Sequence, residues 1–177
     1  LSLGWGGYEG QLQISAHPRG LAAVETTTID RYLLGISEVP SSWPAETLAA
    51  QAVAARTYLA WTLHRGRTIN GNRYDYDICA TDQCQVYRGL EGVGGADGDR
   101  WRDAVSSTAN QILLDGDRPL QALYSSTSGG RTRSVEDVFG SAPNRHLTAV
   151  QSPDESSPFV DWAFPVEFDQ LEAMGGH

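Results

Sequence analysis

The sequence contains no lysine, and each of its 13 basic side chains is an arginine. These arginines are scattered along the chain, and 22 acidic residues outnumber them, which leaves a formal net charge of −9. Proteins that bind nucleic acids usually carry a clustered basic surface. The charge pattern therefore argues against an anionic polymer as the partner and leaves a neutral or weakly charged substrate open.

Long apolar runs are also lacking, so no segment reaches the length that spans a bilayer. The first residues have neither the basic start nor the apolar stretch of a signal peptide. Either the chain is cytoplasmic, or its signal lies outside residues 1–177. The 177 residues are 40% hydrophobic and 20% charged. That composition is typical of a soluble globular protein, and the length suits one domain with its own core.

Only one helix is strongly predicted. It opens near residue 42 with a serine cap and a proline in the first turn, and it ends at a basic pair followed by Gly66. Apolar side chains recur on one face of this helix at positions Leu48, Ala52, Ala55, Leu59 and Leu63. The alanine-rich face favours close packing against a neighbouring element.

Weaker patterns predict the remaining elements. Strands are expected at 11–14 and 21–24, a short helix between Thr28 and Gly35, and a second helix over about 99–108. An Asp-Gly pair at 115–116 predicts a hairpin, and residues 66–95 are expected to be irregular. Together these patterns predict an α+β fold. A central alanine-rich helix and a second helix pack with short antiparallel strands and form a substrate groove.

The chain has two cysteines, Cys79 and Cys84, for which three interpretations compete. A zinc site needs four ligands, or three and a water, and the nearest upstream histidine is His64. A catalytic cysteine needs a histidine partner and an acidic thiol, and nothing local indicates either. A disulfide across this short loop is the best interpretation if the protein is exported.

Glu38 is a candidate general acid. It lies between a short helix and the long one, among the apolar neighbours Ile36, Val39 and Trp43. A carboxyl group held against apolar surface stays protonated to higher pH than usual, as a general acid requires. The alternative is a solvated loop residue or a cap for nearby amides.

Arg56 is a second candidate, because helical geometry places it beside the apolar stripe of the long helix. From there its guanidinium group could hold Glu38 or donate hydrogen bonds to a sugar or a carboxylate. The alternative is a surface arginine whose stem covers apolar neighbours.

A polar loop at 125–130 follows a strand end at Tyr124, and such loops often contact ligands. A serine hydrolase built from Ser125–Ser128, His146 and Asp137 is an alternative. However, the sequence has no Gly-x-Ser-x-Gly elbow. Its four histidines have no recognisable context; they are His17, His64, His146 and His177.

Several motifs follow one another in the order of a known family. They are Tyr32-Leu33-Leu34-Gly35, Ser37-Glu38-Val39-Pro40, Ala50-Gln51-Ala52-Val53-Ala54-Ala55-Arg56-Thr57-Tyr58, Cys84-Gln85-Val86-Tyr87-Arg88-Gly89, Ala122-Leu123-Tyr124 and Ser128-Gly129-Gly130-Arg131-Thr132. Over residues 8–154 the chain resembles the stage II sporulation protein D family, also called the SpoIID/LytB domain. An ordered series of this length is more specific than a short motif.

The resemblance implies a lytic transglycosylase of peptidoglycan. Glu38 would act as acid and then as base, since the muramic acid's own 6-hydroxyl group replaces the second carboxylate of ordinary glycosidases. The expected substrate-binding residues are Arg56, Tyr124, Ser125, Ser126 and Gln85. A non-catalytic module that grips glycan strands and stimulates a cell-wall amidase is the alternative.

The resemblance also sets expectations for the whole chain. Some members bind zinc through a histidine before the first cysteine, but residues 70–74 have none, so no metal or other cofactor is expected. Residues 1–177 are expected to form a single domain, truncated before the family's Gly-His-Gly segment. We expect an extracytoplasmic monomer whose signal or anchor lies elsewhere, with peptidoglycan strands as partner and no nucleic acid.

Overall fold

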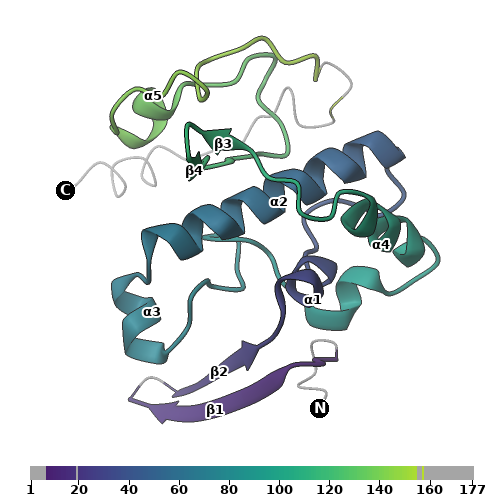
Figure 1. Ribbon diagram of the computed structural model, residues 1–177, viewed down its shortest axis with the longest axis vertical. Helices are drawn as coiled ribbons and strands as arrows, with labels where there is room; N and C mark the ends of the chain where they lie inside the picture. Colours follow the sequence, from purple (N-terminus) through teal and green to yellow (C-terminus); the bar gives the residue numbers. More distant parts are fainter. Residues whose placement is uncertain (1–6, 19, 155–156, 158–177) are drawn as a thin grey trace, which may run out of the picture. The chain divides into compact units, whose positions relative to one another are not determined.

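The computed structural model describes residues 7–18, 20–154 and 157 (Figure 1). The chain divides into two compact units, residues 1–124 and residues 125–177, and each is described by itself. A single domain over the whole chain therefore stays a prediction. The expectations for the first five residues, for His177 and for the C-terminal truncation lie outside the described residues.

The first unit begins with a β-hairpin. Strand β1 (Gln11–His17) pairs antiparallel with β2 (Gly20–Thr26), and the register ends at His17 opposite Gly20. Gly20 has a φ of +132°, a conformation that side chains rarely adopt. Both predicted strands are confirmed, and each is longer than the alternating pattern indicated.

Helix α1 (Ile29–Leu34) has the predicted boundaries. The hydroxyl group of Thr28 accepts a hydrogen bond from the amide of Arg31 at 3.4 Å, which caps the helix start. Gly35 follows the last turn. A short capped helix thus leads directly into the segment that carries Glu38.

Helix α2 (Ala45–Arg65) is the long element of the first unit (Figure 1). It begins after Pro44, which occupies the N-cap position without a side-chain hydrogen bond, so the predicted serine cap is wrong. The predicted apolar face is buried from Leu48 to Leu59, but Leu63 is 44% exposed. The face therefore packs into the core for most of its length and leaves it in the last turn.

Helix α4 (Gly98–Ser107) packs against α1 and α2 and closes the core. Trp101 is almost fully buried there, and its Nε1 donates to the carbonyl oxygen of Leu33 at 3.0 Å. Ala52 and Ala55 have no exposed surface. Such small side chains permit the close approach of neighbouring elements, as the alanine-rich pattern predicted.

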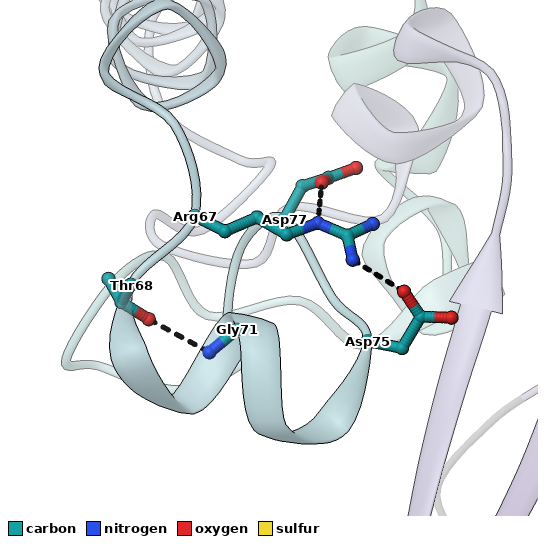
Figure 2. A network of polar contacts seen from close by, with 5 residues as sticks. All are labelled: Arg67, Thr68, Gly71, Asp75 and Asp77. Carbon is teal, nitrogen blue, oxygen red and sulfur yellow. Dashed lines mark hydrogen bonds and ion pairs between the residues drawn. The ribbon is translucent and has the colours of Figure 1, made fainter.

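The segment 66–95 is more ordered than predicted, since it holds α3 (Ile69–Tyr74) and a 3₁₀ helix, η1 (Gly89–Val93). The hydroxyl group of Thr68 caps α3 by accepting from the amide of Gly71 at 3.0 Å. Figure 2 shows the side chain of Arg67 paired with Asp75, which follows the last turn of this helix, and with Asp77. These local contacts form a helix that the glycine- and asparagine-rich composition concealed.

The predicted disulfide is confirmed, because Cys79 and Cys84 are bonded to each other with their Cα atoms 5.6 Å apart. This pairing leaves neither thiol free for the alternative roles as a nucleophile or a zinc ligand. Among the described residues, no group of three or more His, Cys, Asp or Glu side chains could hold a metal ion.

Short strands complete the first unit, and one short helix lies in the second. Strands β3 (Leu114–Asp115) and β4 (Arg118–Pro119) form the predicted hairpin around Gly116, although they are shorter than expected. In the second unit, α5 (Val135–Phe139) begins after Ser134. The α+β class is confirmed. Within the part of the chain described, no helix is long and apolar enough to cross a membrane.

Candidate active site

Two loop segments pair with each other and place Glu38. Ile36 and Tyr87 form an isolated antiparallel bridge, in which the amide of Ser37 donates to the carbonyl oxygen of Val86 at 2.9 Å. A Cβ atom on Gly35 would lie only 2.2 Å from the Tyr87 ring, so glycine is required at this close approach. The pairing brings residue 38 against residue 86, far away in sequence.

The Glu38 carboxyl group is half-buried and held through one of its oxygens. Its Oε1 accepts from the backbone amide of Val86 at 2.7 Å and from the hydroxyl group of Tyr124 at 3.2 Å. Both hydrogen bonds found for this carboxyl group within the described residues fall on Oε1. No hydrogen bond to the second oxygen, Oε2, is found among the described residues.

Gln85 joins the tyrosine on one side of Glu38 to the core. Its Nε2 donates to the Tyr124 hydroxyl at 3.0 Å and to the carbonyl oxygen of Ala55 at 3.3 Å. Its Oε1 accepts from the Tyr32 hydroxyl at 2.9 Å. Gln85 has no exposed surface, so its predicted contact with a substrate does not agree with its position in this structure.

Both tyrosines of this network remain protonated at neutral pH. Burial raises the pKa of Tyr124, and the neighbouring Glu38 carboxylate raises it further, while Gln85 opposes the shift. Burial likewise raises the pKa of Tyr32, with smaller contributions from Tyr124 and Glu38. The hydroxyl group beside Glu38 is thus a hydrogen-bond donor throughout the physiological range.

Arg56 forms hydrogen bonds at the end of α4, and none to Glu38 is found among the described residues. The residue is only 6% exposed. Its guanidinium group donates to the carbonyl oxygens of Val105 and Gln111 and to the hydroxyl group of Thr108. This position corrects both alternatives drawn from the sequence, a surface arginine and a partner of Glu38. Arg56 supports the C-terminal end of α4, and no contact found here supports its predicted contact with substrate.

Ser125 and Ser126 belong to the second unit, where both are exposed. The Ser125 hydroxyl donates to the carbonyl oxygen of Thr127 at 3.4 Å. Because the two units are described separately, the predicted substrate-binding role of these serines stays a prediction.

The alternative serine hydrolase is not assembled in the second unit. The Ser128 hydroxyl donates to Asp154 at 3.0 Å, and Asp137 accepts from Ser134 at 2.6 Å. The ring of His146 accepts from the side chain of Arg145 at 3.0 Å. Hence the Ser128 hydroxyl group, the His146 ring and the Asp137 carboxylate each bond to a group outside this hypothesis.

A cavity of about 600 Å³ lies elsewhere in the first unit. The β-hairpin forms one wall, and Leu59, Leu63, Arg67 and Tyr74 contribute to the other. Its lining does not include Glu38, so a substrate groove beside Glu38 stays a prediction. The cavity was missed by sequence reasoning, because it depends on how the hairpin stands against α2 and α3.

Two contributors to the site were not identified as site residues from the sequence. The backbone amide of Val86 carries no side-chain signal, and Tyr32 acts only through Gln85. Both lie inside the family motifs, so the motifs were the available signal. Their roles depend on contacts between segments that are distant in sequence, which the folded structure shows.

Comparison with known proteins assigns the family. The sequence profile described as SpoIID, Stage II sporulation protein, matches residues 17–114. The chain is 31% identical to Stage II sporulation protein D of Bacillus subtilis over 146 residues, which is 77% of this chain and 42% of that protein. The chain therefore belongs to the SpoIID family, as the motifs predicted.

Two further relatives extend this result. An uncharacterized protein of Brachyspira hyodysenteriae is 30% identical over 168 residues, which cover 93% of this chain and 43% of that protein. The amidase enhancer of Bacillus subtilis is 30% identical over 77% of this chain and 17% of its own length. The chain thus spans less than half the length of these relatives.

Proposed function

We propose that this chain carries the active site of a peptidoglycan lytic transglycosylase, with Glu38 as its single acid and base. The observation that carries the proposal is the anchoring of Glu38. Val86 and Tyr124 hold Oε1 by hydrogen bonds of 2.7 Å and 3.2 Å, and no described residue forms a hydrogen bond with Oε2. A fixed carboxyl group with one open oxygen suits proton transfer to a bound strand.

In the proposed first step, protonated Oε2 gives its proton to the oxygen that links MurNAc C1 to GlcNAc C4. The C1–O bond breaks, GlcNAc leaves with a free 4-hydroxyl group, and positive charge develops on the MurNAc ring. Glu38 becomes a carboxylate in the same step. The two donors on Oε1 stabilise the charge that appears there, as preorganised dipoles do.

In the second step, the 6-hydroxyl group of the same MurNAc attacks C1 and returns its proton to Glu38. The product is a 1,6-anhydro ring, and no water is consumed. One carboxylate therefore suffices, whereas hydrolytic glycosidases place two across the bond. Tyr124 remains a neutral donor because burial and the nearby carboxylate raise its pKa.

Peptide-free glycan strands test this proposal. Wild-type protein is expected to release fragments with 1,6-anhydro ends, detected by mass spectrometry. Glu38→Gln keeps the shape but loses the proton, so the rate is expected to fall at least ~100-fold while strand binding remains. The matched control is Glu46→Gln, an exposed glutamate in the first turn of α2, with an unchanged rate. Release of hydrated fragments with reducing ends, in place of anhydro ends, would refute the transglycosylase.

A second candidate is a non-catalytic module that binds glycan strands and stimulates an amidase. It is favoured by the similarity to the amidase enhancer of Bacillus subtilis over 77% of this chain. The same experiment separates the two, because a module binds the strands and leaves them intact. On strands that still carry stem peptides, adding the module is then expected to accelerate peptide release by a purified cell-wall amidase.

We also propose that the protein works outside the cytoplasm, where peptidoglycan lies. The Cys79–Cys84 disulfide supports this location, since such bonds persist in oxidising compartments and are rare in the cytosol. Fractionation of cells that express the natural gene, with an antibody to the chain, tests the location. Recovery in the cytoplasm with free thiols would contradict it.

A further inference from the structure

We propose that Gln85 is a positioning residue, which directs the hydroxyl proton of Tyr124 onto Glu38 and does not touch the glycan. Its expected effect on rate rests on the function proposed above. The geometry itself is independent of that function.

The orientation of the Gln85 amide follows from its neighbours. The carbonyl oxygen of Ala55 can only accept a hydrogen bond, so the group that faces it at 3.3 Å must be the NH₂ end. The opposite end, Oε1, then receives the proton of Tyr32 at 2.9 Å. Reversing the amide would set two carbonyl oxygens against each other inside the core.

This orientation decides where the Tyr124 proton points. A tyrosine hydroxyl has one proton, and its oxygen can also accept. The second N–H of Gln85 is donated to that oxygen at 3.0 Å, so the Tyr124 proton is left for Oε1 of Glu38 at 3.2 Å. Each donor in the series from Gln85 to Glu38 is thus matched to an acceptor.

Burial excludes a direct role for Gln85 in binding. The side chain has no exposed surface, whereas Tyr124 is 36% exposed. A glycan strand can therefore meet the tyrosine but not the glutamine. A buried amide with all these partners satisfied orients its neighbours instead of contacting a ligand.

A double-mutant cycle tests this role. Gln85→Leu is expected to lower kcat about tenfold with KM changed less than about twofold, since one oriented hydrogen bond to Glu38 is lost. On a Tyr124→Phe background the same change is expected to cost nothing further in kcat. Equal losses on both backgrounds would overturn the proposal, because Gln85 would then act independently of Tyr124.

Gln85→Glu is the second variant, with nearly the same shape. An ionised carboxylate at position 85 would accept the Tyr124 proton and draw it away from Glu38, whereas a protonated carboxyl group there could donate as glutamine does. The activity of this variant relative to wild type is therefore expected to recover as the pH falls. A constant ratio across pH would contradict the proposal. The control, Thr62→Val, removes a buried hydroxyl group from α2 and is expected to leave kcat unchanged.

NMR provides a readout that does not require activity. The ¹³C shift of the Glu38 carboxyl carbon is expected to move in Tyr124→Phe and in Gln85→Leu, with no further movement in the double variant. In the wild-type protein, the Gln85 amide protons are expected to show contacts with the Tyr124 ring. Missing contacts, or an unmoved Glu38 signal, would overturn the positioning role. If the NMR results appear as expected but no anhydro ends form, the proposed function alone fails.

Discussion

The carboxylate of Asp154 accepts hydrogen bonds from several donors of one loop, residues 127–130. Its carboxylate accepts from the backbone amides of Ser128, Gly129 and Gly130 and from the hydroxyl groups of Thr127 and Ser128. Gly129 and Gly130 have φ values of +70° and +92°. Such backbone turns consecutive amides toward one anion.

These hydrogen bonds, led by that of the Ser128 amide, lower the pKa of Asp154 from 3.8 to about 2. Because the folded value lies below the unfolded one, the stabilisation is complete above about pH 4 and disappears as the pH falls through about 2. The amide signals of residues 128–130 are therefore expected to titrate with a midpoint near the folded pKa. Asp154→Asn serves as the control, in which this titration is absent. A midpoint at the ordinary aspartate value would show that the loop does not bind the carboxylate.

At the scale of elements, the end of α4 depends on an arginine from α2. Arg56 donates to the carbonyl oxygen of Val105, in the last turn of α4 where carbonyl groups lack helical amide partners, and to that of Gln111 in the segment that follows the helix. Burial lowers the pKa of Arg56, yet a guanidinium group stays charged at any physiological pH. The positive charge also complements the negative end of the helix dipole.

Arg56→Met is expected to lower the free energy of unfolding by about 2 kcal/mol, because buried carbonyl groups lose their donor. Denaturant unfolding followed by circular dichroism measures this loss. The control is Arg102→Met. Arg102 is an exposed arginine of α4, and its Nε lies 3.9 Å from Oδ1 of Asp99. That change is expected to cost less than about 0.5 kcal/mol. Equal losses in the two variants would contradict the capping role.

The disulfide holds the segment that leads into Gln85 and Val86. Replacing Cys79 and Cys84 together by serine opens a short loop, and the chain-entropy relation then predicts a loss of about 2 kcal/mol. Wild-type protein in a reducing agent is expected to unfold at the same denaturant concentration as the double variant. A wild-type midpoint unaffected by reduction would show that the bond contributes nothing to stability.

At the scale of the whole molecule, the net charge of −9 bears on binding. Stem peptides of peptidoglycan carry carboxylates, so the acidic protein is expected to bind strands with stem peptides more weakly than peptide-free strands at low salt. Raising the salt from about 20 to about 500 mM is expected to narrow this difference, because screening shortens the range of repulsion to a few ångströms. Affinities for both strands at each salt concentration measure the effect. If the difference in affinity between the two kinds of strand does not change with salt, steric exclusion of the stem peptides explains it and charge repulsion does not.

The sequence predicted the elements whose signals are local. The caps of α1, the face of α2 from Leu48 to Leu59 and the turn at Gly116 each follow from a few neighbouring residues. Helix α3 escaped prediction because its composition favours loops, while the Thr68 cap and the Arg67 ion pairs beside it are seen only in the structure. The motifs identified the family, which the sequence comparisons then confirmed.

The sequence by itself determined the family, the α+β class and the choice of Glu38 as the residue of interest. Only the tertiary structure decided what surrounds that residue, because the partners of Glu38 come from residues 86 and 124. It also showed that Gln85 and Arg56, which the motifs assigned to substrate binding, are buried and bond to other groups of the protein. A sequence pattern can place a residue on one side of its own helix or strand. Which element covers that side depends on packing between distant segments.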